Sequence, residues 1–178
     1  MNRHHPVRAA LAASAVFASI GAIAAARPIG LPAPWLPLDP GAAHCKADEA
    51  HAELRNGALR FEIAIGGRSL RPSAFDNGFT GAAGALHGEL FSLLPRGGGK
   101  LAASGFRLDG AVRCGRIAPK PGAARAAERH AGSALDAKLV DPASGLRVQW
   151  RALLRDGSSY VREETTFESG QAIDLASV

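Results

Sequence analysis

Residues 135–167 constrain the fold most, because their pattern predicts three consecutive antiparallel strands joined by two short turns. In the middle segment one face holds the apolar residues Leu146, Val148, Trp150, Ala152 and Leu154. The opposite face holds Arg147, Gln149, Arg151 and Arg155, and is interrupted only by Leu153. Alternation with a period of two predicts a half-buried strand with Trp150 in the core. Turn residues at 141–145 (Asp-Pro-Ala-Ser-Gly) and 156–159 (Asp-Gly-Ser-Ser) bound this strand.

The first half of the chain also has the pattern of successive β-hairpins. Asn56-Gly57 predicts a tight hairpin with a type I′ turn, because both central positions of that turn require positive φ. After it, apolar residues recur at every second position, at Leu59, Phe61, Ile63 and Ile65. This alternation predicts a second strand with one face in the core.

Further turns divide the rest of the chain. Gly66-Gly67 leads into a shorter segment containing Leu70, which ends at Asp76-Asn77-Gly78. We expect strands at 89–94 and 100–108, separated by a turn at 95–99, whereas 119–133 is expected to form a loop with room for one helical turn at 123–129. Short strands at regular spacing predict an all-β fold, an antiparallel β-sandwich, with a closed barrel as the alternative.

The N-terminus has the pattern of an export signal. Residues 1–8 carry two arginines and no acid, residues 9–21 are small and apolar, and Ala22-Ile23-Ala24 and Ala24-Ala25-Ala26 both suit signal peptidase. The alternative is an uncleaved anchor, but this alanine-rich stretch is shorter and less apolar than the roughly twenty residues that a bilayer span needs. We therefore predict a signal peptide over 1–26, export to the periplasm or the exterior, and no stable membrane anchor after cleavage.

A proline-rich segment follows the signal. Residues 27–40 contain five prolines, which exclude a helix, so we interpret 27–50 as an extended lead-in and 51–178 as the β-sandwich domain. Removal of 1–26 leaves 152 residues, which suffice for one domain with its own core.

The chain has two cysteines, Cys45 and Cys114. In an exported protein an isolated pair predicts a disulfide, with two unrelated thiols as the alternative. Cys45 lies too far from the apolar segment for a lipid anchor. No metal site is predicted, because His44, His51, His87 and His130 are dispersed along the sequence.

The charge gives little support for nucleic-acid binding. The net charge of the full chain is +5 and falls to +3 when Arg3 and Arg8 leave with the signal. The remaining arginines are interleaved with acids instead of forming a basic patch.

Motifs that carry chemistry are scarce, and no cofactor is predicted. Gly97-Gly98-Gly99-Lys100 lacks the spacing of a phosphate-binding loop and has Leu101 where a Ser or Thr is needed. Glu163 and Glu164 are adjacent, so a strand directs them to opposite faces and they cannot act together as a catalytic pair. We predict no catalytic residue in this chain.

Asp76 and Asn77 are the candidate ligand-binding residues. They lie between Phe75 and Phe79, so a loop here combines hydrogen-bonding groups with an aromatic platform that suits a sugar. The alternative is that Asp76 and Asn77 only form a turn.

Four segments resemble a known family. These are 53–61 (ELRNGALRF), 88–93 (GELFSL), 145–151 (GLRVQWR) and 154–163 (LRDGSSYVRE), of which the last is the most specific. Over 52–178 the chain resembles the N-terminal β-supersandwich domain of α-galactosidase-like, melibiase-type secreted glycoside hydrolases. The resemblance implies a partner (β/α)₈ barrel that carries both catalytic carboxylates.

Two functions follow as expectations. The first is a non-catalytic leading module of a secreted carbohydrate-active enzyme, truncated before its barrel, because 172–178 ends without a polar tail. The alternative is a freestanding exported β-sandwich that binds a glycan or a protein partner.

Overall fold

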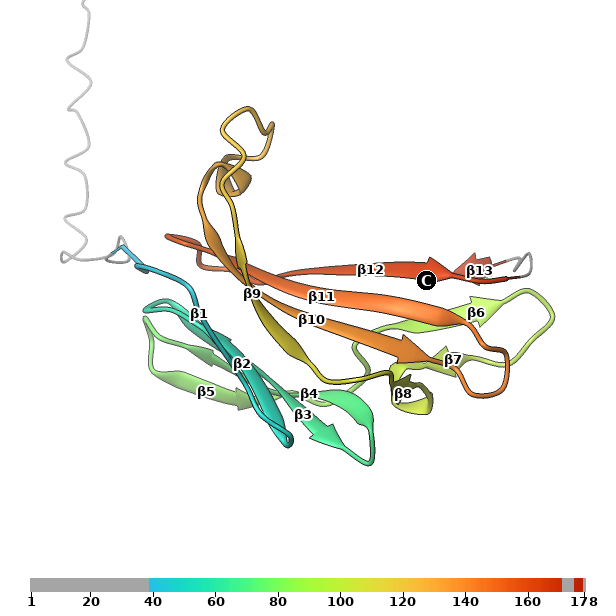
Figure 1. The fold of residues 1–178 in the computed structure, drawn as a ribbon. Coiled ribbons are helices and arrows are strands. Elements are labelled where there is room, and N and C mark those ends of the chain that lie inside the picture. The colour runs from blue at the N-terminus through green and yellow to red at the C-terminus, as the bar shows by residue number, and fades with distance from the viewer. Residues whose placement is uncertain (1–38, 171–174, 178) are drawn as a thin grey trace, which may run out of the picture. The chain divides into compact units, whose positions relative to one another are not determined.

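The computed structural model describes residues 39–170 and 175–177. Within these residues the chain forms antiparallel strands and two 3₁₀ helices, η1 (Ala103–Gly105) and η2 (Ala126–Arg129), and it contains no α-helix (Figure 1). No helix of the described part is long and apolar enough to cross a membrane. The predicted signal peptide and most of the proline-rich segment lie outside the described residues.

Three sheets, all with antiparallel pairing, make up the described part. The first sheet has the order β1-β2-β3-β4-β5: β1 (His44–Ala47), β2 (His51–Arg55), β3 (Leu59–Gly66), β4 (Ser69–Asn77) and β5 (Ala82–Ala85). The second has the order β12-β11-β10-β8, and β9 also pairs with β10: β8 (Arg107–Leu108), β9 (Arg113–Ile117), β10 (Gly132–Val140), β11 (Arg147–Arg155) and β12 (Arg162–Glu168). The third is β13-β6-β7: β6 (Ser92–Pro95), β7 (Leu101–Ala102) and β13 (Leu175–Ser177).

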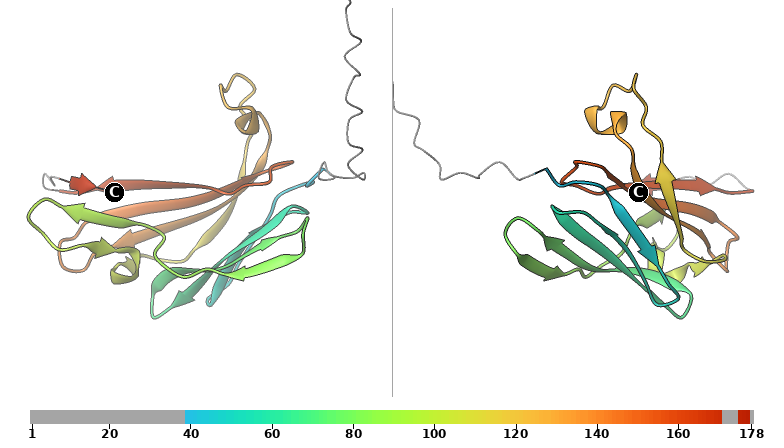
Figure 2. Two further views of the ribbon diagram at one scale, coloured as in Figure 1. Left: turned by 180° about the vertical axis from the view of Figure 1, so that it is seen from behind. Right: turned by 60° about the vertical axis from the view of Figure 1, so that its left-hand side comes forward.

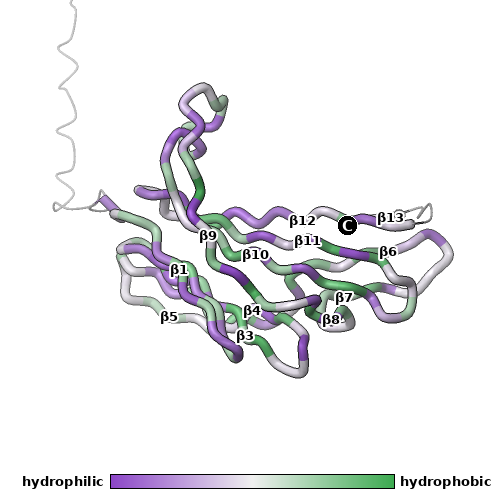
Figure 3. Tube along the Cα trace, viewed as in Figure 1, coloured by the Kyte–Doolittle hydropathy of each residue, from purple (hydrophilic) through white to green (hydrophobic). Residues whose placement is uncertain are grey.

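The first and second sheets share one hydrophobic core. Buried residues of β2 and β3, such as Leu54 and Ile63, belong to the same cluster as Leu135 of β10 and Trp150 of β11. Figure 2 shows the two sheets facing each other, and along the strands hydrophobic and hydrophilic residues alternate (Figure 3). Period-two patterning therefore places the apolar faces together, and their burial is the main source of stability.

A disulfide joins the two sheets, as predicted. Cys45 on β1 bonds to Cys114 on β9 across 69 residues of sequence. Nearby, the hydroxyl of Ser133 donates a 2.8 Å hydrogen bond to the carbonyl oxygen of Ala43. The first strand is thus fixed to the second sheet covalently and by hydrogen bonding.

The three strands predicted over 135–167 are confirmed as β10, β11 and β12. The predicted core face is buried from Leu146, which directly precedes β11, to Leu154, and Trp150 is fully buried. In the 141–145 turn the Asp141 carboxylate accepts hydrogen bonds from the Ser144 hydroxyl and the backbone N–H groups of Ser144 and Ala143. The aspartate is buried, and its hydrogen bonds replace the lost water.

The hairpin at Asn56-Gly57 is confirmed, but the predicted type I′ turn is wrong. Neither residue has positive φ; instead the Asn56 side-chain oxygen accepts hydrogen bonds from the N–H groups of Ala58 and Leu59. The two-residue turn with positive φ lies one hairpin later, at Gly67 (58°) and Arg68 (65°). Arg68 is held there by hydrogen bonds in both directions with the backbone of Leu108.

Two predicted strands are shorter than expected. Of 89–94 only Ser92 onward is a strand, because Glu89 instead accepts hydrogen bonds from the backbone N–H and hydroxyl of Ser104 at 2.7 Å. The 100–108 segment is divided into β7, η1 and β8. These segments lack strict alternation, and their contacts are to residues distant in sequence.

The structure also adds strands that the sequence pattern did not indicate. β1 falls inside the predicted lead-in 27–50, so the first sheet begins before residue 51. β5 consists only of alanine and glycine, and β9 surrounds Cys114. β4 is longer than predicted and runs through Asp76 and Asn77, with a register shift opposite Glu62 and Ile63.

Candidate functional site: an arginine-rich cavity

The most structured candidate site lies under residues 118–131, the connection from β9 to β10 that we call the excursion. It carries η2 and stands out from the sheets (Figure 1). Arg155, at the end of β11, holds both ends of the excursion. Its guanidinium donates hydrogen bonds to the carbonyl oxygens of Ala118 (3.0 Å) and His130 (2.7 Å). Arg155 is only 9% exposed, so these two bonds solvate an otherwise buried guanidinium.

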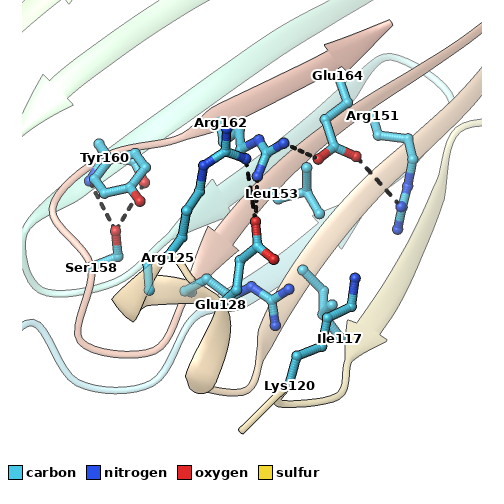
Figure 4. A pocket seen from close by; sticks show the side chains of 12 residues that line it. Ile117, Lys120, Arg125, Glu128, Arg151, Leu153, Ser158, Tyr160, Arg162 and Glu164 are labelled. Atoms are coloured by element: carbon cyan, nitrogen blue, oxygen red, sulfur yellow. Dashed lines mark hydrogen bonds and ion pairs between the residues drawn. The ribbon is translucent and has the colours of Figure 1, made fainter. Parts of the chain in front are cut away.

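A cavity of about 360 Å³ lies between the excursion and the outer face of β11 and β12. On the side of the cavity formed by the sheet lies Leu153, which is 7% exposed. The other residues on this face of β11 are polar. The twelve lining residues, shown in Figure 4, are Ile117, Lys120, Arg125, Ala127, Glu128, Arg151, Leu153, Arg155, Ser158, Tyr160, Arg162 and Glu164. Five of them are basic and two are acidic, so the lining carries an excess of positive charge.

Arg162 lies between the two acids of the cavity (Figure 4). Its guanidinium is 2.7 Å from Glu128 of the excursion and 3.0 Å from Glu164 of its own strand. Arg125 also contacts Glu128 at 3.4 Å, and Arg151 contacts Glu164 at 3.8 Å. The charges alternate in a network that links the excursion to β11 and β12.

This network determines what the acids can do. The hydrogen bond from Arg162, supported by Arg125, holds the pKa of Glu128 below its ordinary value, against the smaller opposing effect of burial. A glycosidase acid must keep a proton near neutral pH, which requires a raised pKa. The lowered pKa of Glu128, and the ion pairs that both glutamates form with Arg162, therefore suit charge recognition instead of acid catalysis.

The predicted sugar-binding residues Asp76 and Asn77 lie on β4, away from this network. Asp76 forms a 2.8 Å ion pair with Arg60 of β3, and the Asn77 side chain accepts hydrogen bonds from the N–H groups of Phe79 and Thr80. Phe75 and Phe79 are 36% and 42% exposed, so an aromatic surface does exist beside them. The structure gives both polar residues partners inside the fold, and sugar contact by them stays a prediction.

Glu163 and Glu164 point to opposite faces, as predicted. Glu164 joins the arginine network, whereas Glu163 accepts a 3.0 Å hydrogen bond from the indole N–H of Trp150 on the inner face. The residue as a whole is exposed, but partial desolvation of its carboxyl beside Trp150 raises the pKa of Glu163, and the hydrogen bond from Trp150 opposes that effect. The two glutamates thus have different environments and cannot act together.

Sequence reasoning missed the cavity because its residues are far apart in the chain: Glu128 and Arg162 are separated by 34 positions. One signal was present, since Leu153 interrupts the polar face of β11. An apolar residue on that face indicates a cover, and the excursion provides it. The described residues contain no cluster of three or more histidines, cysteines or acids that could hold a metal.

Comparison of the chain with known protein families, curated proteins and solved structures found no match.

Proposed function

We propose that this chain is a non-catalytic β-sandwich module of an exported carbohydrate-active enzyme of the α-galactosidase-like type. The observation that carries the non-catalytic role is the position of Arg162 between Glu128 and Glu164, the only acids lining the cavity. Because the contact with Arg162 lowers the pKa of Glu128, this glutamate is not a protonated acid, and both glutamates are ion-paired with Arg162 instead of being free to act as a nucleophile.

Three further features support the proposal. Two antiparallel sheets share one core, in the manner of a sandwich. The Cys45–Cys114 disulfide suits an oxidising compartment and supports export. The four segments that resemble the N-terminal supersandwich of melibiase-type enzymes support a role beside a catalytic barrel.

The test is hydrolysis of an aryl α-galactoside by the purified full chain across pH 4–8. We expect no turnover above a buffer blank. Turnover that is lost in Glu128→Gln or Glu164→Gln, with the fold of the variant intact by circular dichroism, would refute the non-catalytic role.

The link to a barrel is tested separately, by reading the DNA after the codon for Val178. A frame that encodes a (β/α)₈ barrel supports the module, and a separately produced barrel should then gain activity or stability from this chain. A gene with no such frame favours the second candidate function, a freestanding exported β-sandwich that binds a glycan or a protein partner. The positively charged cavity is the observation in favour of that candidate.

A further inference from the structure

The cavity under the excursion has the size and enclosure of a small-molecule site. Its volume of about 360 Å³ lies at the lower end of the range for ligand pockets, roughly 300–1,000 Å³. One wall is the regular surface of β11 and β12, and the other is the excursion, fixed at both ends by Arg155. The site is therefore held in place without a ligand.

The charge of the lining favours an anion. The lining holds five basic residues, Lys120, Arg125, Arg151, Arg155 and Arg162, and two acids, Glu128 and Glu164, and Asp136 just outside the lining also pairs with Arg151. Arg162, Arg151 and Arg125 are paired with acids, whereas no contact is drawn to the ammonium of Lys120 among the residues of Figure 4. Lys120 acts on Glu128 only through its charge, which leaves its three donors available.

The remaining lining residues suit the body of a sugar. Tyr160 is 52% exposed and lines the cavity together with the apolar side chains of Ile117 and Leu153. An accessible aromatic ring offers a flat apolar surface for one face of a pyranose. The guanidinium of Arg125, whose side chain is 65% exposed, contacts Glu128 through one terminal nitrogen at 3.4 Å, and its other N–H groups suit two parallel hydrogen bonds to a ligand carboxylate.

We propose that this cavity binds a carboxylate-bearing sugar of the uronic acid class. Its carboxylate lies between Lys120 and Arg125, and its ring packs against Tyr160. This inference rests on the carbohydrate context of the proposed function, but it concerns binding alone and requires no turnover. An aryl galactoside assay can therefore fail or succeed without deciding it.

The test is an NMR titration of the ¹⁵N-labelled full chain with D-galacturonate, with D-galactose and sodium sulfate as separate probes. We expect galacturonate to shift amides of 118–131 and 160–164 with a dissociation constant of about 1 mM, and galactose at the same concentration to shift them little. Raising the salt to about 0.5 M should weaken binding, because exposed charges are screened at that ionic strength.

Two variants test separately the charge of Lys120 and the aromatic ring of Tyr160. Lys120→Gln should weaken galacturonate binding about tenfold, the scale of one charge-assisted contact, and Tyr160→Ser should weaken galacturonate but not sulfate. Lys46→Gln, which removes the same charge from the exposed residue Lys46 on β1, is the matched control and should leave binding unchanged.

Three results would overturn the proposal. The first is the absence of shifts with galacturonate at about fifty times the expected dissociation constant, a concentration that should saturate a site of this kind. The second is equal shifts with galactose, which would remove the role of the carboxylate. The third is sulfate binding as tightly as galacturonate with no effect of Tyr160→Ser, which would reduce the site to one for small anions only.

Discussion

Removal of the Cys45–Cys114 disulfide should cost about 4 kcal/mol of unfolding free energy. The bond closes a loop with a sequence separation of 69 residues, and the loss of chain entropy in the unfolded state grows with the logarithm of that length. With about 2.1 + 1.5R ln n cal/mol/K for n near 70, the value at 298 K is about 4.4 kcal/mol. Since the free energy of unfolding of a single domain is about 5–15 kcal/mol, loss of this bond should remove a large part of it.

The assay is urea unfolding of the wild type and of Cys45→Ala/Cys114→Ala, monitored by circular dichroism. We expect a lower midpoint and a larger m-value, because the unfolded chain without the bond exposes more surface. As a control, a reducing agent should bring the wild type to the level of the double variant and leave the variant unchanged. A loss below about 1 kcal/mol would refute the loop-entropy reasoning and mean that the bond constrains the unfolded state very little.

Three other predictions concern single side chains. Arg155→Met should cost about 3 kcal/mol in urea unfolding, because it leaves two carbonyl oxygens without their charged donor, and limited proteolysis should then cut the excursion first. Asp141→Asn should destabilise at pH 7, and because the folded pKa of Asp141 is lowered, thermal melts should show the difference shrinking as the pH falls below about 4, the ordinary aspartate range. The folded pKa of Glu163 is raised, so the contribution of Glu163 to stability should fall as the pH rises through the ordinary glutamate range. Melts of Glu163→Gln should lack that contribution, and an unchanged slope would contradict desolvation of this carboxyl as the cause of the raised pKa.

The sequence predicted the elements whose information is local. On β11 the alternation from Leu146 to Leu154 depends only on neighbours, so the strand, its core face and the burial of Trp150 were all predictable. The disulfide was predictable as well, because two cysteines allow only one pairing. Asp141 and Gly157 marked their turns for the same local reason.

Elements that depend on distant contacts were not predictable in this way. β5 has no alternating pattern because all of its residues are small, and it is a strand only because it pairs with β4 from Ala74 to Asn77. The type I′ turn was expected at Asn56-Gly57 from a common dipeptide. The chain instead forms it at Gly67-Arg68, where Leu108 of another strand holds Arg68 in place.

The candidate site follows from the same division between local and distant information. Leu153 is an apolar residue on the face of β11 that alternation predicts to face water, and both it and Arg155 on the same face are buried. Their burial requires a cover, and the excursion is held in this position by hydrogen bonds from Arg155 to Ala118 and His130 and by the ion pair of Arg162 with Glu128. Leu153, which interrupts the polar face of β11, therefore indicated where the chain folds back over its own sheet. The cavity with its excess of positive charge is the consequence of that cover, because the excursion adds Lys120 and Arg125 to the arginines of β11 and β12.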